Sequence, residues 1–325
     1  MAKAVLSCKI DEWSASLHPA QVGVNLPGGV ELLGHASRAY LEKNPDHCVM
    51  VIDSTNAYNS CCRTAMLEQA KKISPDLLAV LRVGMQEDAE LLFALENGET
   101  GKIKSRQGTR QGNPLSPFLY AAVDDLAMRR SIQELQDGGV NAYMGGYQDD
   151  KVVFCDPRDC PIVLDIVARN LSKINIKVNV KKTKIYRPAD FSEKLAHELV
   201  LHGIPSEAIF DKSGDQRRGV LVVGAPVGDD TFATASLDEP FEKLKMLRSR
   251  LEAFSDDISA QSQHLIIRFS ASSFAQHLAR HGGDRSAMRC ELQRYDSEVW
   301  ALYKSRLLHL QTSPTAMDQA FLPAS

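Results

Sequence analysis

Two adjacent aspartates, Asp149 and Asp150, are placed where they could hold a metal ion. They lie between two short apolar runs, a pattern that predicts a tight β-hairpin with both carboxylates at its tip. Neighbouring carboxylates repel each other and lose hydration on burial unless a cation neutralises them. A hard divalent ion such as Mg²⁺, which prefers carboxylate and phosphate oxygens, would do so. Because paired aspartates are also common in solvated turns, this pair alone does not establish a metal site.

A third aspartate, Asp53, follows the apolar run Val49–Ile52. Four apolar residues in succession predict a buried strand, and a carboxylate at the end of such a strand projects into a cleft. An alternative is a structural role, because aspartate is a good N-cap for a following helix. Together with Asp149 and Asp150, Asp53 would complete a three-carboxylate site. Such a site can hold two Mg²⁺ about 3.5–4 Å apart for in-line phosphoryl transfer.

A glycine-rich turn, Gly108–Pro117, lies between these aspartates. Ser116 is the expected N-cap of the helix that follows, and Pro117 its first residue. Backbone N–H groups at a helix start favour anionic ligands, although an ordinary capping loop would have the same composition.

The order of these motifs, followed by Asn179-x2-Lys182-Thr183, resembles a reverse transcriptase, and the wording is closest to the type carried by non-LTR retrotransposons. The resemblance extends from about Pro19 to at least Gly228. It implies an α+β fold: a right-hand polymerase palm, with an antiparallel sheet and helices on one face, partial fingers and a helical thumb. It also implies RNA-directed DNA polymerase activity with an RNA template, a DNA primer and dNTPs.

The resemblance also implies roles for individual residues. Asp53 and Asp149 match the principal metal ligands and Asp150 a weaker one, and the backbone carbonyl of Ile52 could add a further ligand. The ion would be Mg²⁺, with Mn²⁺ as the alternative.

The resemblance assigns a second group of residues to the nucleotide. Tyr58 matches the bulky residue that excludes a 2′-hydroxyl, and Lys182 matches a lysine near the leaving pyrophosphate, a general-acid candidate. A core aromatic residue and a solvated charge are the alternatives for these two. The remaining matches to nucleotide-binding positions are Arg110, Gln111 and Gly112.

The helices and strands that position these residues are predicted from the spacing of apolar residues and from the Gly, Pro and Asn residues that interrupt it. Helices are expected over residues 30–43, 59–72 and 161–174, after Ser74-Pro75, after Pro117, and in the tail over 239–254, 258–281 and 284–310; a hairpin is expected around Asn97-Gly98. The expected domains are a partial fingers segment (1–48), a palm (49–232) with a fingers insertion at about 70–110, and a helical thumb-like subdomain and tail (233–325).

Composition sets the wider bounds. The 325-residue chain carries a net charge of -3, which predicts weak, salt-sensitive nucleic-acid binding through local Lys/Arg clusters. Seven cysteines without a Cys-x2-Cys pattern favour reduced thiols that pack in the core. Without an apolar run of membrane-spanning length, we expect an intracellular protein that does not enter a membrane. Neither the choice between nucleus and cytoplasm nor the oligomeric state follows from the sequence.

One departure from the family pattern keeps two functions open. Few residues precede Gln21, so we expect the fingers hairpin to be missing and the chain to be a fragment or relic of a retroelement protein. The protein is then either an RNA-directed DNA polymerase or a catalytically inactive, retroelement-derived domain that binds nucleic acid or protein. A palm polymerase that makes RNA is a third reading, and Tyr58 argues against it.

Overall fold

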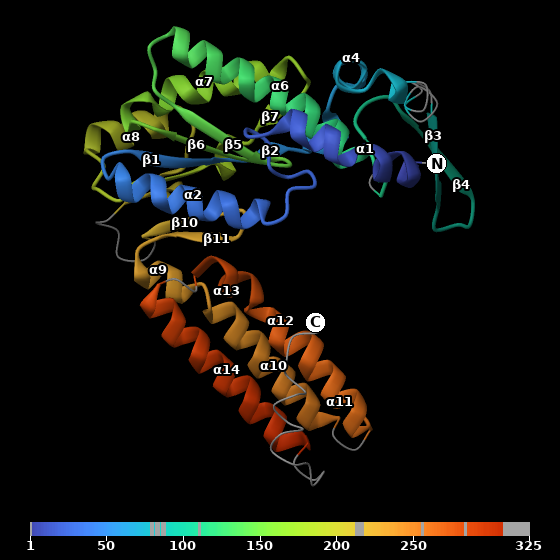
Figure 1. Cartoon of the computed structure of the whole chain (residues 1–325), viewed down its shortest axis with the longest axis vertical. Coiled ribbons are helices and arrows are strands. Elements are labelled where there is room, and N and C mark those ends of the chain that lie inside the picture. The colour runs from blue at the N-terminus through green and yellow to red at the C-terminus, as the bar shows by residue number, and fades with distance from the viewer. Residues whose placement is uncertain are drawn as a thin grey trace. The chain divides into compact units, whose positions relative to one another are not determined.

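The computed structural model describes residues 2–78, 81, 85, 89–109, 112–211, 218–254, 257–282 and 285–307 (Figure 1). The chain divides into two compact units, Met1–Val223 and Gly224–Ser325. Within the described residues, each helix is too short or too polar to cross a membrane.

A five-stranded sheet forms the centre of the first unit. Its strands, in spatial order, are β5 (Tyr143–Tyr147), β6 (Asp150–Cys155), β1 (Cys48–Ile52), β8 (Lys184–Tyr186) and β9 (Ile209–Phe210). All neighbours are antiparallel except β8 and β9. The strand predicted from the apolar run is the central strand β1, in which Cys48, Val49, Met50 and Ile52 are buried. A strand buried on both faces requires cover on both sides.

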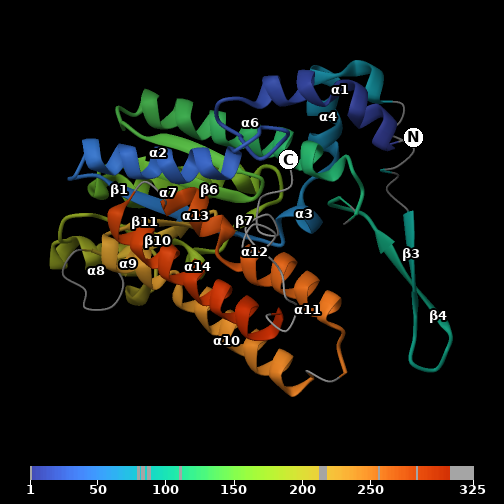
Figure 2. The same ribbon diagram turned by 60° about the horizontal axis from the view of Figure 1, so that its bottom comes forward.

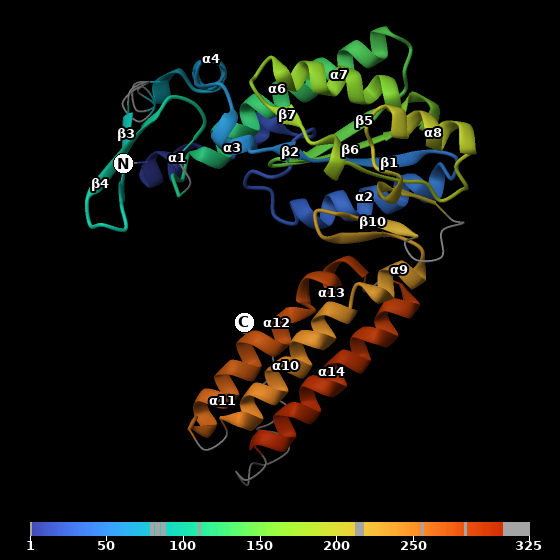
Figure 3. The ribbon, with the colours of Figure 1, turned by 180° about the vertical axis from the view of Figure 1, so that it is seen from behind.

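Helices provide that cover from both faces. α6 (Ser116–Asp137) and α7 (Cys160–Ser172) lie on one face, and α2 (Gly29–Lys43) lies on the other (Figure 3). A Cβ added at Gly145 of β5 would meet Leu33 of α2, and one added at Gly146 would meet Met128 of α6. The α+β class is therefore confirmed, but the expectation of helices on one face only is wrong.

The first unit contains further helices and strands outside this sheet. They are α1 (Ala2–Leu17), β2 (Ser54–Thr55), α3 (Ala57–Ser60), α4 (Arg63–Ile73), η1 (Pro75–Leu77), β3 (Ala89–Ala94), β4 (Thr100–Ser105), η2 (Pro157–Asp159), β7 (Lys177–Val178), η3 (Val180–Lys182), α8 (Glu193–Leu201), η4 (Ser206–Ala208) and β10 (Gly219–Val222). α1 was not predicted. It packs Trp13 against Phe118 of α6, with ring centroids 4.3 Å apart, so the N-terminal segment belongs to this core.

Most predicted elements of this unit are present with shifted ends. The helix expected over 59–72 is interrupted at Cys61-Cys62, between α3 and α4. The hairpin around Asn97-Gly98 is formed by β3 and β4, and Figure 2 shows it projecting from the unit. Its side chains Leu92 and Ile103 are largely exposed.

The second unit is mostly helical, as predicted. It comprises β11 (Ala225–Gly228), α9 (Asp230–Ala235), α10 (Asp238–Ala253), α11 (Ala260–Ile266), the π-helical η5 (Ile267–Ala271), α12 (Ser272–Phe274), α13 (Gln276–Gly282) and α14 (Ser286–Leu307). The single helix expected over 258–281 is divided into four segments. Tyr295 of α14 donates a hydrogen bond to the Ala271 carbonyl (2.7 Å), where the π-turn frees backbone groups from regular α-helical pairing.

Candidate active site at the end of the central strands

The three predicted carboxylates lie at one end of the β1–β6 strand pair. Ile52 of β1 pairs with Lys151 of β6, so Asp53 follows β1 where Asp150 begins β6. Tyr147 pairs with Asp150 across the hairpin, which leaves Gln148 and Asp149 as a two-residue turn. Gln148 has a positive φ of 58°. The hairpin prediction is confirmed, and the antiparallel register brings Asp53 to the tip of that hairpin.

The carboxylates influence one another electrostatically. Burial raises the pKa of the Asp150 carboxyl, the charges of Asp149 and Asp53 raise it further, and only Lys151 opposes them. The three groups are not drawn together as tightly as metal ligands: in the described part of the chain, the trio with ligand atoms all within 4.8 Å consists of cysteines. The carboxylate end therefore carries excess negative charge.

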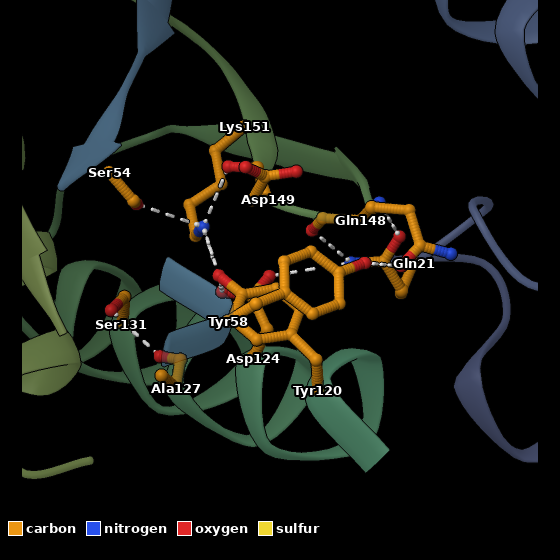
Figure 4. A network of polar contacts seen from close by, with 10 residues as sticks. All are labelled: Gln21, Ser54, Tyr58, Tyr120, Asp124, Ala127, Ser131, Gln148, Asp149 and Lys151. Atoms are coloured by element: carbon orange, nitrogen blue, oxygen red, sulfur yellow. Dashed lines mark hydrogen bonds and ion pairs between the residues drawn. The ribbon is translucent and has the colours of Figure 1, made fainter. Parts of the chain in front are cut away.

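A buried ion pair lies beneath the turn (Figure 4). Lys151 Nζ is 2.7 Å from Asp124 Oδ1, and both side chains are completely buried. The same ammonium donates to the Asp149 backbone carbonyl (3.1 Å), so it holds the turn from below. Tyr120 donates to Asp124 Oδ1 (3.3 Å). Burial raises the pKa of Asp124, and the charge of Lys151 counteracts this effect.

Sequence reasoning missed this pair, although two signals were present. Lys151 interrupts the apolar run of a strand, and Asp124 lies four residues after Tyr120 on a helix whose surroundings are apolar. Charged residues are almost never fully buried without a partner, so each position called for one.

A second contact docks the turn onto the segment before α2. Gln21 Oε1 accepts hydrogen bonds from the Gln148 amide (2.8 Å) and the Gly23 amide (3.0 Å), and Gln21 Nε2 donates to the Gln148 carbonyl (3.0 Å). Backbone bonds extend the contact, since the Val22 amide donates to the Gly146 carbonyl (2.7 Å) and the Gly146 amide donates to the Ala20 carbonyl (2.7 Å). The segment around Gln21 therefore continues the sheet at its β5 edge.

Tyr58 is held between these two groups (Figure 4). Its half-buried ring stacks on Tyr120, with centroids 4.5 Å apart and planes inclined by 24°. Its hydroxyl donates to Gln148 Oε1, and Gln148 Nε2 donates to the Gly23 carbonyl. Burial, followed by the charge of Asp149, raises the pKa of the Tyr58 phenol. The ring thus lies close to Asp149 and is fixed in orientation.

The glycine-rich turn begins against the same helix as Tyr58. The Thr109 amide donates to the Tyr58 carbonyl and the Gly108 amide to the Cys61 carbonyl, each at 2.8 Å. Gly108 has φ 67°, and a Cβ there would lie 2.3 Å from the Asn59 carbonyl oxygen, so only glycine fits. The buried Arg63 guanidinium donates to the carbonyls of Gly108 (2.9 Å), Gln107 (3.1 Å) and Ser105 (2.5 Å).

The rest of this turn is described in part. Arg110 and Gln111 lie outside the described residues, whereas Gly112 is exposed with φ 83°. Ser116 is the first residue of α6 rather than its predicted N-cap. The Asn113 side chain explains the shift, because its Oδ1 accepts from the Leu115 amide (3.0 Å) and shapes the turn before the helix.

The predicted Lys182 lies in the exposed turn that follows β7. β2 pairs with β7, and the Asn179 amide donates to the Asp53 carbonyl (2.8 Å), so this turn is anchored beside Asp53. The exposed lysines here form no ion pair among the described residues; they are Lys177, Lys181, Lys182 and Lys184.

Comparison with known proteins gives both a family and a fold. The family model described as reverse transcriptase (RNA-dependent DNA polymerase) matches residues 2–221. Among solved structures, the apo telomerase of Candida tropicalis is similar at 14% identity with a TM-score of 0.52, covering 98% of this chain and 53% of that one. The telomerase of Candida albicans, in complex with a TWJ fragment of telomeric RNA, has 12% identity and a TM-score of 0.51, covering 97% and 54%.

These telomerase similarities show a shared fold, and the chain spans about half the length of the telomerases that it matches. The family match covers the sheet and all of the motifs described above. This chain belongs to the reverse transcriptase (RNA-dependent DNA polymerase) family.

Proposed function

We propose that the carboxylate end of β1 and β6 catalyses template-directed nucleotidyl transfer as an RNA-directed DNA polymerase. The observation that carries the proposal is the convergence of Asp53, Asp149 and Asp150 at one strand end, where the other two charges raise the pKa of Asp150. Excess negative charge formed from oxygen ligands suits a hard divalent cation. Mg²⁺ is the proposed ion, with Mn²⁺ as an alternative, held by these three residues and the Ile52 carbonyl.

The protein residues contribute by positioning. When bound, a pair of divalent ions would supply activation of a primer 3′-hydroxyl and stabilisation of the leaving pyrophosphate. Lys151 and Gln21 hold the backbone of the turn that carries Asp149, which limits how far this carboxylate would have to move to reach the ions. Lys182, in the turn anchored to Asp53, is the proposed general acid toward pyrophosphate.

Tyr58 is the proposed selector for deoxyribonucleotides. Its stacking on Tyr120 and its bond to Gln148 hold the ring near Asp149, where it would leave no room for a 2′-hydroxyl. Arg110, Gln111 and Gly112 are proposed to contact the incoming nucleotide. The left-handed backbone of Gly112 would allow a close approach there.

Nucleic acid would approach over the lysine-rich turn. Lys177, Lys181, Lys182 and Lys184 are exposed beside the β2–β7 pair that anchors Asp53. These lysines have no ion-pair partner among the residues that the structure describes, so they are available for phosphates, and their contribution should weaken with salt. By contrast, basic residues of α10 pair with glutamates: Lys243 with Glu239, Lys245 with Glu242 and Arg248 with Glu298.

The proposed partners are therefore an RNA template, a DNA primer and dNTPs. In domain terms, we propose partial fingers over 1–48, a palm over 49–232 with a fingers insertion at about 70–110, and a thumb-like subdomain and tail over 233–325. The residues of these sequence motifs support an origin in a retroelement of the non-LTR type.

Primer extension on a primed RNA template with dNTPs and Mg²⁺ tests the proposal. We expect extension by the wild type, none by Asp149→Ala, and wild-type extension by Asp165→Ala, which removes an exposed carboxylate from α7 in the same unit. Circular dichroism should show that all three proteins are folded. A folded wild type that does not extend the primer would favour the alternative function, a catalytically inactive binding domain. If Asp165→Ala lost as much primer extension as Asp149→Ala, the assignment of Asp149 to the active site would be refuted.

A further inference from the structure

Three cysteines meet at the opposite end of the strand pair that carries the carboxylates. Cys48 is the first residue of β1 and pairs with Cys155, the last residue of β6. Cys160 is the first residue of α7, which packs over this end of the sheet. All three side chains are completely buried. They come from two strands and a helix, so their meeting is a property of the fold and not of a local sequence motif.

The sulfur positions match the dimensions of a metal–thiolate centre. The Sγ atoms are separated by 3.3 Å (Cys48–Cys160), 3.8 Å (Cys155–Cys160) and 4.0 Å (Cys48–Cys155). With a Zn–S bond of about 2.3 Å, two thiolates on a tetrahedral ion lie about 3.8 Å apart. The observed separations bracket that value.

We propose that Cys48, Cys155 and Cys160 form a binding site for a thiophilic metal ion, with Zn²⁺ as its occupant. Thiolates are soft ligands that select zinc over magnesium, so this end of the strand pair would take a different ion from the carboxylate end. The three thiolates would supply three of the four ligands of a tetrahedral zinc ion. The proposal is independent of polymerase activity, because it concerns only the packing of β1, β6 and α7.

The local structure is consistent with a fixed ligand set. Between Cys155 and Cys160, the η2 turn is closed by Asp156, whose Oδ1 accepts from the Arg158 amide (2.9 Å). Cys48 and Cys155 are fixed by the strands β1 and β6, and Cys160 is fixed by the first turn of the 13-residue helix α7. A bound ion would tie the start of this helix to both strands and stabilise the folded unit by mass action.

Cys61 provides a matched control. It is also a free cysteine completely buried in the core of the first unit, but it is not part of the cysteine trio. A Cys61→Ser variant therefore carries the cost of a buried hydroxyl without removing a proposed ligand.

The test uses the whole chain, purified under reducing conditions, stripped with a chelator and then titrated with Zn²⁺ or Co²⁺. We expect one equivalent of zinc in wild type and Cys61→Ser, with a rise in the midpoint of thermal unfolding. Cys160→Ser and Cys48→Ser should lose both effects. Cobalt should give thiolate-to-metal charge-transfer absorption only in the first two proteins.

Three results would overturn the proposal. The first is a folded wild type that gives no charge-transfer band and binds no zinc, a measurement that does not depend on any variant folding. The second is full zinc binding by the triple variant C48S/C155S/C160S, which would place the ion elsewhere. The third is a disulfide between two of these cysteines, detected by mass spectrometry after mild oxidation, in a protein that binds no metal when reduced.

Discussion

Replacing Lys151 by methionine should leave Asp124 buried without its partner. The two side chains are completely buried and 2.7 Å apart, so the lone carboxylate cannot be hydrated and would take up a proton instead. Protonating at pH 7 a group with an ordinary pKa of 3.8 costs about 4 kcal/mol. This agrees with the range of about 3–5 kcal/mol for breaking a buried ion pair from one side. For a unit of this size, the unfolding midpoint should fall by about 8–16 °C.

The pH dependence of the stability lost in Lys151→Met identifies protonation of Asp124 as its cause. In Lys151→Met the native state would hold a proton on Asp124 that the unfolded chain releases above its ordinary pKa of 3.8. Native protein then binds more protons than unfolded protein, so its stability relative to wild type should fall by about 1.4 kcal/mol for each pH unit of increase above that pKa.

Urea unfolding at several pH values measures both quantities, and the double variant K151M/D124L supplies the control. Replacing both charges by apolar groups should restore stability to within about 1–2 kcal/mol of wild type, or exceed it. A penalty for Lys151→Met that is below about 1 kcal/mol or constant with pH would refute the reasoning. So would a double variant no more stable than the single one.

Further predictions concern the glycine-rich turn, the carboxylates and the ring of Tyr58. Gly108→Ala should lower the free energy of unfolding by about 1–3 kcal/mol, because its Cβ meets the Asn59 carbonyl. Gly112 has a similar φ, but an added Cβ would meet nothing within 4 Å, so Gly112→Ala should lose less stability. Equal losses in the free energy of unfolding, measured by urea titration, would contradict the steric explanation. Asp150→Asn should raise the thermal midpoint at neutral pH. The raised pKa of Asp150 means that ionisation destabilises the fold, so this gain should shrink as pH falls toward the ordinary carboxyl range. Tyr58→Ala should incorporate ribonucleotides that wild type and Tyr58→Phe reject, and equal incorporation by wild type and Tyr58→Ala would exclude the steric role.

The positions of the site residues could be predicted where they depend only on a strand in the sequence or on two strands that are neighbours along the chain. Val49–Ile52 is apolar throughout, and Asp53 ends that run, so a carboxylate at the end of a central strand followed directly from the pattern. The Asp149 turn was equally predictable, because β5 and β6 are adjacent in sequence and a two-residue connection leaves no alternative pairing.

Contacts between distant segments could not be predicted in this way. Gln21 meets Gln148 only after the segment before α2 joins the β5 edge, and no periodicity in either segment specifies that partner. α1 was missed because few of its positions are buried, so its sequence shows no broad apolar stripe; Trp13 and Leu17 carry most of its packing. The π-turn at Ile267–Ala271 was missed for a different reason, since a single extra residue in a helical turn leaves composition unchanged.

The docking of the Asp149 turn has a consequence for how position 148 can vary. Gln21 holds residue 148 through its backbone amide and carbonyl, both of which every residue except proline possesses. Only the contacts to Tyr58 and to the Gly23 carbonyl depend on the glutamine side chain. At residue 148, the backbone therefore holds the turn, and the side chain separately contacts the Tyr58 ring. Because residue 148 has a positive φ of 58°, glycine, asparagine and aspartate are the replacements that should fold best, and these variants should differ in how freely the Tyr58 ring moves.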